Sequence, residues 1–303
     1  MDRKSPVALL RRSVSGYLFL LPALVLFTLF AWWPIINGLL LSFRELDLIR
    51  YTQPDYRPEW IGFGNFESII GDPLLQTAWL NTFRFMALAL LLGYLVPVLL
   101  AISVNEVRRG KGYFRLAFYL PVILPPMISI LLWKYFYDPG SGIMNVLVTF
   151  FGGDPLQWIY SADTSMLSLV ILWTWTTAGS TMLLYLAALQ GIPASLYESA
   201  EIEGASVWQR LFHITLPEIR GVMIILLVLQ IIGTMQIFTE PFVMTDGGPV
   251  NSTLTVMVLL YRYAFERGEI GWATALGLLI FVVLVAFSLL YLFVTRKFRG
   301  AAR

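Results

Sequence analysis

The chain contains no cysteine and only one histidine. Without cysteine it cannot form disulfides, thiolate metal sites or cysteine nucleophiles. A single histidine cannot build a histidine-rich metal site, and the sequence has no H-E-x-x-H motif. A phosphate-binding loop is also missing, because its nearest match, Gly110-Lys111-Gly112, lacks the first glycine and the hydroxyl residue of G-x-x-x-x-G-K-[ST]. We therefore assign this chain no catalytic residue, no metal ligand and no bound cofactor.

Charged residues are scarce as well: they make up 13% of the chain, whereas hydrophobic residues make up 58%. Soluble domains contain about 25% charged and roughly 45–50% apolar residues, so this composition indicates a membrane protein in contact with a lipid bilayer. The net charge of +2 does not point to nucleic acid, because the basic residues lie at the ends of apolar runs and not along one face.

Six apolar runs approach the roughly 20 residues that a helix needs to cross the hydrocarbon core of a bilayer. They cover residues 17–41, 85–104, 116–133, 166–188, 221–238 and 272–294. The first run is too long for a signal peptide and lacks a clean small-residue cleavage site, so we expect a retained helix. The sequence therefore predicts an all-α membrane protein with six transmembrane helices in a single domain, residues 1–303.

Lysine and arginine accumulate in the cytoplasmic loops of membrane proteins. If the amino terminus is cytoplasmic, twice as many basic residues lie on the cytoplasmic side as on the outer side. The cytoplasmic set is Arg3, Lys4, Arg11, Arg12, Arg108, Arg109, Lys111, Arg115, Arg210, Arg220, Arg296, Lys297, Arg299 and Arg303. This bias predicts that both termini, and the segment that follows the fourth helix, are cytoplasmic.

Polar and aromatic residues in the fourth apolar run, and in the fifth run with its extension through Met244, are candidates for a substrate path. A polar side chain is costly in hydrocarbon and should face the bundle interior or a wet path. The candidates are Trp173, Trp175, Thr176, Gln230, Gln236 and Glu240. Two alternatives remain open, which are interhelical hydrogen bonding for the glutamines and a position at the outer interface for Glu240.

Residues 194–217 form a polar, helix-forming segment between two apolar runs. Pro193 suits the first position of a helix, and Ser195 with Glu198 fits a capping box. Gly204 predicts a tight bend between two short helices, because glycine tolerates backbone conformations that other residues avoid.

The second short helix should carry an exposed apolar face. Trp208, Leu211 and Phe212 follow the i, i+3, i+4 spacing that places side chains on one helix face, and Pro217 is expected to stop the helix and start the next span. Burial of this face against a partner protein is one interpretation, and contact with the lipid surface is the alternative. The glutamates of the segment disfavour the second, because an anionic leaflet repels them.

At this point the sequence resembles a known family. Glu198-Ser199-Ala200, Gly204 and Ile214-Thr215-Leu216-Pro217 resemble the E-A-A…G…I-x-L-P cytoplasmic loop of permease subunits of bacterial ATP-binding-cassette importers. The pattern from Leu196 to Pro217 is similar to the carbohydrate-uptake branch, and IGFGNF at 61–66 and TDGGPVNST at 245–253 agree with it. Ser199 replaces the usual alanine, and Glu203 replaces the aspartate that commonly precedes the glycine.

The resemblance implies the type I importer permease architecture, with segment 194–217 as a cytoplasmic coupling helix between helices four and five. The coupling residues it implies are Glu198, Ala200, Gly204, Ala205, Trp208, Leu211, Phe212, Leu216 and Pro217. It also implies a location in the cytoplasmic (inner) membrane and three kinds of partner. These are a second, homologous permease subunit, two ATPase subunits that carry ATP and Mg²⁺, and an extracytoplasmic substrate-binding protein.

The expected function is translocation of a mono- or oligosaccharide, or of a related compound such as a glycerophosphate, driven by ATP hydrolysis on the partners. A self-sufficient secondary transporter or channel is the alternative. Such a protein would need ion-coupling carboxylates inside the membrane, and the six runs with their extensions offer at most Glu240. A membrane enzyme would need a catalytic constellation that the sequence lacks.

Overall fold

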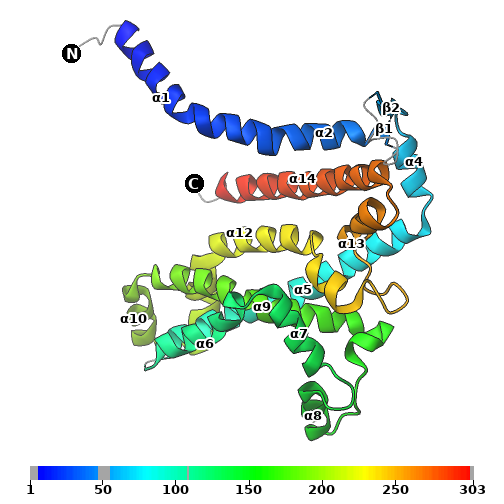
Figure 1. Cartoon of the computed structure of the whole chain (residues 1–303). Helices are drawn as coiled ribbons and strands as arrows, with labels where there is room; N and C mark the ends of the chain where they lie inside the picture. Colours follow the sequence, from blue (N-terminus) through cyan, green and yellow to red (C-terminus); the bar gives the residue numbers. More distant parts are fainter. Residues whose placement is uncertain (1–5, 47–54, 108, 301–303) are drawn as a thin grey trace. The chain divides into compact units, whose positions relative to one another are not determined.

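The structure is a computed structural model that describes residues 6–46, 55–107 and 109–300 (Figure 1). Four of the basic residues used to predict the orientation, Arg3, Lys4, Arg108 and Arg303, lie outside these residues. The elements, in chain order, are α1 (Pro6–Phe27), η1 (Thr28–Trp32), α2 (Trp33–Leu41), β1 (Arg44–Glu45), β2 (Glu59–Trp60), α4 (Gly64–Ile70), α5 (Pro73–Glu106), α6 (Lys111–Ile123), α7 (Pro126–Phe136), α8 (Ile143–Phe150), η2 (Trp158–Tyr160), α9 (Ala162–Gln190), α10 (Ala194–Ile202), α11 (Val207–Arg210), η3 (Leu211–Thr215), α12 (Leu216–Met235), η4 (Pro241–Thr245), α13 (Val256–Tyr261), η5 (Arg262–Glu266) and α14 (Ile270–Gly300).

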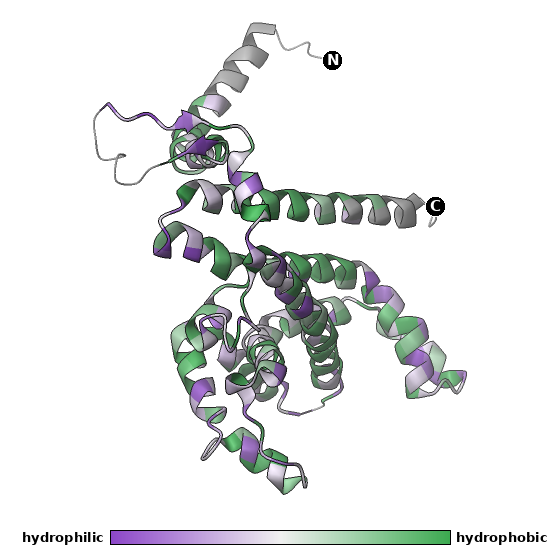
Figure 2. Cartoon of the chain, turned by 90° about the vertical axis from the view of Figure 1, so that its right-hand side faces the viewer, coloured by the Kyte–Doolittle hydropathy of each residue, from purple (hydrophilic) through white to green (hydrophobic). Residues whose placement is uncertain are grey.

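The described residues contain five helices that are long and apolar enough to cross a membrane, and a sixth span if one bent pair is counted as one. The five are Tyr17–Leu41, Pro73–Glu106, Ala162–Gln190, Val207–Met235 and Ile270–Phe293. These helices are coloured mainly hydrophobic in Figure 2, where hydrophilic residues gather in the connecting segments. The predicted helical membrane architecture is confirmed. The fifth span starts earlier than expected, at Val207, and ends at Met235.

The bent pair is the third predicted span, which is broken between α6 and α7. The two helices meet at 99°. Pro125 and Pro126 stand at the break, where Pro125 is the N-cap of α7. Neither proline can donate a backbone hydrogen bond, so a straight helix cannot continue through them.

The chain divides into two compact units, and residues 1–71 and 260–279 form the first. In this unit the short strands β1 and β2 pair antiparallel, with Arg44 opposite Trp60. The amide of Asn65 donates hydrogen bonds to the carbonyl oxygens of Ser42 and Arg44, at 3.0 and 2.9 Å. A Cβ at Gly271 would lie 2.6 Å from the Asn65 amide oxygen, so α14 begins in close contact with this residue. These contacts explain the asparagine of the IGFGNF stretch.

Residues 72–259 and 280–303 form the second unit, which contains the candidate site. Two clusters of buried side chains hold its helices together. One cluster contains Phe85 of α5, Trp133 of α7 and Leu169 of α9. The other contains Val98 of α5 and Met182 of α9. The core therefore follows the interface between α5 and α9 along its length.

The TDGGPVNST stretch forms a tight loop in the second unit. Asp246, Val250 and Asn251 have positive φ, as does Gly247. The side-chain amide of Asn81 on α5 donates to the carbonyl oxygens of Asn251 and Leu254, at 2.7 and 3.1 Å. Such a backbone is costly and persists where surrounding contacts hold it. Asn81 therefore anchors the loop to α5.

Candidate functional site: the coupling segment and the substrate path

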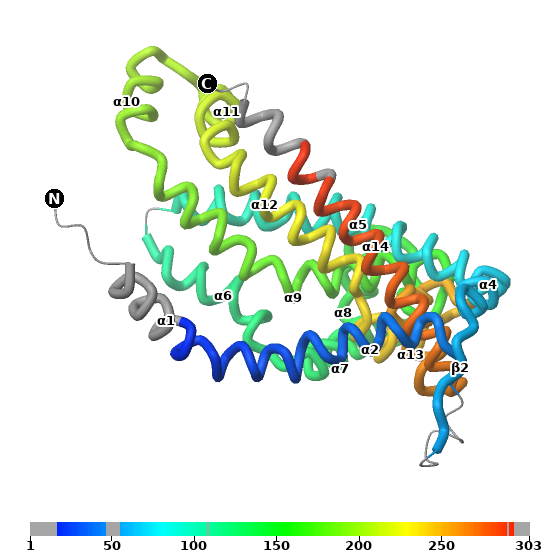
Figure 3. Tube along the Cα trace, turned by 90° about the horizontal axis from the view of Figure 1, so that it is seen from above, coloured from blue at the N-terminus to red at the C-terminus, as the bar shows by residue number. Residues whose placement is uncertain are grey.

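The segment between α9 and α12 consists of two short helices joined by a sharp turn, beyond the ends of α9 and α12 in Figure 3. α10 ends in a Schellman motif, in which the N–H of Ala205 donates to the Ala200 carbonyl at 2.9 Å and the N–H of Gly204 donates to the Glu201 carbonyl at 3.0 Å. Gly204 has φ +77°, and a Cβ added to it would meet no atom within 4 Å. Backbone conformation and not crowding therefore requires glycine here. The predicted bend is present.

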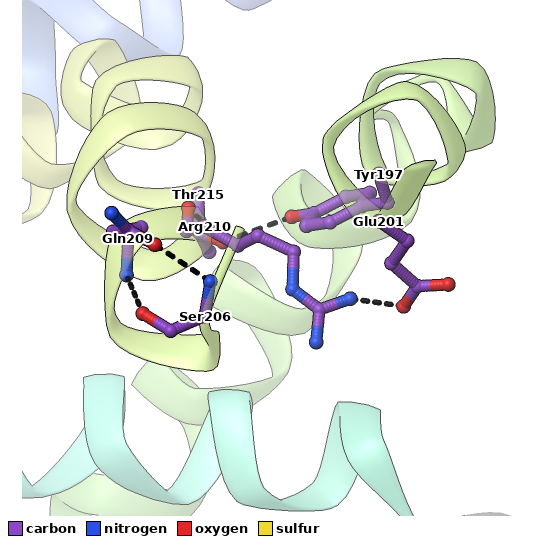
Figure 4. Close-up of polar contacts among 6 residues, drawn as sticks. All are labelled: Tyr197, Glu201, Ser206, Gln209, Arg210 and Thr215. Carbon is purple, nitrogen blue, oxygen red and sulfur yellow. Dashed lines mark hydrogen bonds and ion pairs between the residues drawn. The ribbon is translucent and has the colours of Figure 1, made fainter. Parts of the chain in front are cut away.

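The second helix begins with a capping box, but at a different place from the one predicted. The Gln209 N–H donates to the Ser206 hydroxyl, and the Ser206 N–H donates to the Gln209 side chain at 2.7 Å (Figure 4). The predicted box at Ser195 and Glu198 is wrong. α10 begins at Ala194 with Pro193 as its N-cap, so Pro193 does not take the predicted first helical position, and Ser195 is already inside the helix and cannot cap it.

Two side-chain contacts brace the two short helices against each other (Figure 4). The hydroxyls of Tyr197 on α10 and Thr215 in η3 are hydrogen-bonded at 3.0 Å. Glu201 on α10 forms an ion pair with Arg210 on α11. An ion pair with an exposed carboxylate contributes about 0–1 kcal/mol, so the pair mainly sets orientation. Together with the Schellman turn, these contacts fix the angle between the helices.

An exposed apolar surface covers the outside of the segment. The rings of Trp208 and Phe212 stack with centroids 6.3 Å apart, and the two residues are 68% and 58% exposed. Val207, next to Trp208 in the sequence, and Ile202 at the end of α10 are exposed as well. Leu211, the third member of the predicted face, is only partly exposed. The surface is therefore formed by an aromatic pair with aliphatic neighbours.

The segment is continuous with the fifth span, and the prediction that Pro217 ends the helix is wrong. α11, the π-helical turn η3 and α12 form one helix, in which the Leu216 N–H donates to the Leu211 carbonyl. This i→i−5 bond accommodates Pro217, which cannot donate. Leu216 packs against the core cluster that contains Ile219. α11 and α12 therefore share one continuous helical backbone.

The substrate-path candidates do not form one cluster. Trp173 and Gln230 each pack close to Gly93 of α5, where a Cβ would lie 2.9 Å from Trp173 and 3.1 Å from Gln230. The Gln230 amide also donates to the Ala89 carbonyl. Trp175 instead packs edge-on against Trp133, with ring centroids 5.7 Å apart. This arrangement supports interhelical hydrogen bonding for Gln230.

The other three candidates lie apart from that contact. The Thr176 hydroxyl donates back to its own helix, at the Trp173 carbonyl. Gln236 is exposed and donates to the Ile232 carbonyl at 3.3 Å. Glu240 is partly buried and lies beyond the end of α12, as the N-cap of η4. These three remain candidates on sequence grounds alone.

Several residues of structural importance carry no clear sequence signal. Gly93 and Gly179 allow close helix contacts, and Asn81 anchors a loop 170 residues away. Tyr197 and Thr215 are 18 residues apart in sequence.

The Ser206-x-x-Gln209 pattern could have been found, because it matches the capping-box spacing as well as the pattern chosen. Among the described residues, no group of three His, Asp or Glu side chains could hold a metal ion.

The structure combines apolar membrane helices with an exposed pair of short helices that are braced against each other. The second of these short helices continues into a membrane helix, and this combination is that of a transporter permease. The chain belongs to the family of binding-protein-dependent transport system inner membrane components, whose family model matches residues 89–300. It is 31% identical over 284 residues to the probable ABC transporter permease protein YurN of Bacillus subtilis, covering 92% of this chain and 95% of that protein. It is 30% identical over 292 residues to the trehalose/maltose transport system permease protein MalF of Thermococcus litoralis, covering 94% and 95%.

A solved structure shares the fold. The bacterial alginate ABC transporter, in complex with an alginate pentasaccharide-bound periplasmic protein, contains a chain with a TM-score of 0.81 and 27% identity, covering 95% of this chain and 96% of that chain. The family and the fold implied by the coupling-segment motif are confirmed. The chain is a membrane transporter subunit of the ABC importer permease family, in which ATP hydrolysis takes place on separate subunits.

Proposed function

We propose that this permease moves a carbohydrate across the cytoplasmic membrane, and that segment 194–217 receives the force for this movement from an ATPase subunit. The observation that carries the proposal is the stacked pair Trp208 and Phe212, exposed on a helix that continues without a break into a membrane span. Buried aromatic residues dominate the binding energy of many protein interfaces. This pair is therefore suited to fill an apolar cleft on a partner.

The proposed assembly has four further subunits. A second, homologous permease pairs with this chain, and two ATPase subunits hold ATP and Mg²⁺ on the cytoplasmic side, where both termini of this chain also lie. An extracytoplasmic binding protein delivers the substrate. The family description names binding-protein dependence, and the alginate transporter is bound to a periplasmic protein. Closure of the ATPases would push α11, and α12 with it, toward a new position and so alternate access to the path.

A neutral sugar is the proposed substrate class. Two of the similar systems are named for saccharides, which are trehalose and maltose in one and the acidic polysaccharide alginate in the other, whereas a third is named for sn-glycerol-3-phosphate. In this chain Trp173 and Gln230 both lie next to Gly93, and an aromatic ring together with an amide suits a polyol. An anionic ligand would require a cation in the path, but the six apolar runs contain none, and Arg84 and Lys134 only adjoin them at the predicted outer edge. This charge pattern favours a neutral sugar over an acidic one or a glycerophosphate.

Reconstitution tests the proposal. The chain is placed in liposomes alone, or with its partner permease, the ATPases and the binding protein, and uptake of labelled oligosaccharides is measured. We expect uptake only from the full set and only with ATP. Uptake by the chain alone, driven by an ion gradient, would show a secondary transporter and overturn the proposal. Uptake of glycerophosphates in preference to sugars would overturn the substrate class only.

A further inference from the structure

A cavity of about 400 Å³ lies inside the second unit, and four helices line it, α5, α6, α7 and α9. Of the substrate-path candidates, Trp175 borders it, whereas Trp173 and Gln230 do not. On α5 the lining residues are Leu92, Val96 and Leu100, which are one helical turn apart. The lining therefore extends roughly 12 Å along α5, at 1.5 Å per residue. The cavity follows the direction of this membrane-spanning helix.

The cavity separates the two core clusters. Leu92 packs against the cluster that contains Trp133, and Leu100 packs against the cluster that contains Val98. It is open on one side, because Ala117 of α6 is exposed and Leu92 and Leu100 are only partly buried. In a membrane protein such an opening faces hydrocarbon, a neighbouring subunit or a water-filled path.

The lining chemistry does not suit a sugar. None of the eleven lining residues has a charged side chain. Apart from Thr174 and two tryptophans, all of them are apolar. The hydroxyls of a sugar that entered such a site would lose their hydration without gaining enough hydrogen-bond partners. A linear apolar group, in contrast, gains free energy with each methylene that it buries.

Two polar residues that border the cavity lack a hydrogen-bond partner. The indole Nε1 of Trp133 and the hydroxyl of Thr174 are buried and unpaired among the described residues. Trp133 is 6% exposed and Thr174 is 7% exposed. Buried polar groups in native proteins are nearly always paired, so the indole N–H of Trp133 calls for an acceptor at the cavity wall. An indole N–H can only donate, which specifies an acceptor such as an ester carbonyl.

We propose that the cavity binds one acyl chain of an ester-linked membrane phospholipid. The methylene tail fills the apolar channel between the two core clusters, and the ester carbonyl accepts the indole hydrogen bond of Trp133. The bound tail completes the packing of α6 and α7 against α5 and α9, beside the break at Pro125. The site includes neither Trp173 nor Gln230 and does not depend on the identity of the substrate.

A cavity-filling variant and a matched control test the proposal. Val96→Phe places a ring in the cavity, whereas Leu95→Phe places the same ring on the exposed face of α5. The full chain, in membranes with its partner permease and ATPases, is exposed to a phospholipid that carries a photoactivatable diazirine on one acyl chain. After irradiation, labelled residues are mapped by mass spectrometry. Label on Phe118 and Pro121 is compared with label on the exposed Leu120.

Label on Phe118 and Pro121 should persist in the unmodified chain and in Leu95→Phe. In Val96→Phe it should fall about tenfold relative to Leu120, because two or more methylene groups are excluded. Equal labelling in Val96→Phe and the unmodified chain would overturn the proposal. Label that appears only when the partner permease is absent would show that a partner side chain fills the cavity and would overturn it as well.

A second variant tests the hydrogen bond. Trp133→Phe keeps an aromatic ring in the core but removes the indole N–H. Retention of an ester-linked lipid through detergent purification should fall about fivefold, as expected for the loss of one hydrogen bond, whereas retention of an ether-linked lipid should not change. An equal fall for both lipids would contradict a role of the indole donor. Sugar uptake is not the readout, so failure here is distinguishable from failure of the proposed function.

Discussion

Gly179 of α9 lies directly against the backbone of α6, so that a Cβ at this position would collide with the carbonyl oxygen of Phe118. The obstructing atom belongs to backbone, which cannot rotate away as a side chain can. The contact brings α6, the first half of the broken span, against α9. The first helix of the broken span is therefore positioned by close packing and not by chain connectivity.

Gly179→Ala should destabilise the protein by about 1–3 kcal/mol, the usual cost of overpacking. The thermal unfolding midpoint of the purified protein would fall. Gly233→Ala is the matched control, because Gly233 lies in α12 with nothing within 4 Å of the added Cβ. Alanine also favours a helix over glycine by about 1 kcal/mol, so the control should be neutral or stabilising. Equal midpoints for the two variants would contradict the close contact.

Asn81→Asp should loosen the 245–253 loop. The substitution preserves shape but replaces an amide donor with an acceptor, at 2.7 Å from the Asn251 carbonyl. Two hydrogen bonds are lost and oxygen faces oxygen, which should cost about 2–4 kcal/mol of stability. Gln76→Glu makes the same chemical change at an exposed position of α5 and serves as the control. Limited proteolysis of the loop measures the effect, and unchanged protection in Asn81→Asp would refute it.

Substitution of Gly204 by a residue that cannot adopt its positive φ should abolish coupling to the ATPase while the protein still inserts into the membrane. Valine is strained at φ +77°, whereas asparagine tolerates the left-handed region. Gly204→Val should therefore lose most ATP-dependent uptake, and Gly204→Asn should keep most of it. Insertion is checked by the amount of each variant in the membrane fraction. Normal uptake by Gly204→Val would show that the turn has no role in coupling.

Truncation of the aromatic pair should weaken ATPase binding. Trp208→Ala and Phe212→Ala each remove an exposed ring, and the loss at a buried interface is about 2–4 kcal/mol for a dominant residue. Co-purification of the ATPase subunit with the permease measures this loss. Phe151→Ala removes a ring that is 82% exposed on the other side of the predicted membrane, and should have no effect. Undiminished co-purification of both aromatic variants would place the ATPase contact elsewhere.

The sequence predicted the bent helix pair of segment 194–217 because its signals are local. A polar stretch between apolar runs, a glycine after a short helix and an aromatic pair at i, i+4 are each readable from neighbouring residues. The same local reading was wrong at Pro217 and Ser195. A proline normally ends a helix, but a π-helical turn carries this one through. A serine followed three residues later by glutamate often caps a helix, but here the helix already starts at Ala194, before the serine.

The sequence by itself determined the class of protein, the approximate position of every span and the place of the bend. Each of these depends on hydropathy or on backbone preference, and both are properties of consecutive residues. Only the tertiary structure decided which polar residues meet, as with Asn81 and Asn251, and which glycines allow helices to touch. It also revealed a cavity with an unpaired indole, because packing between helices depends on side chains that are distant in the chain.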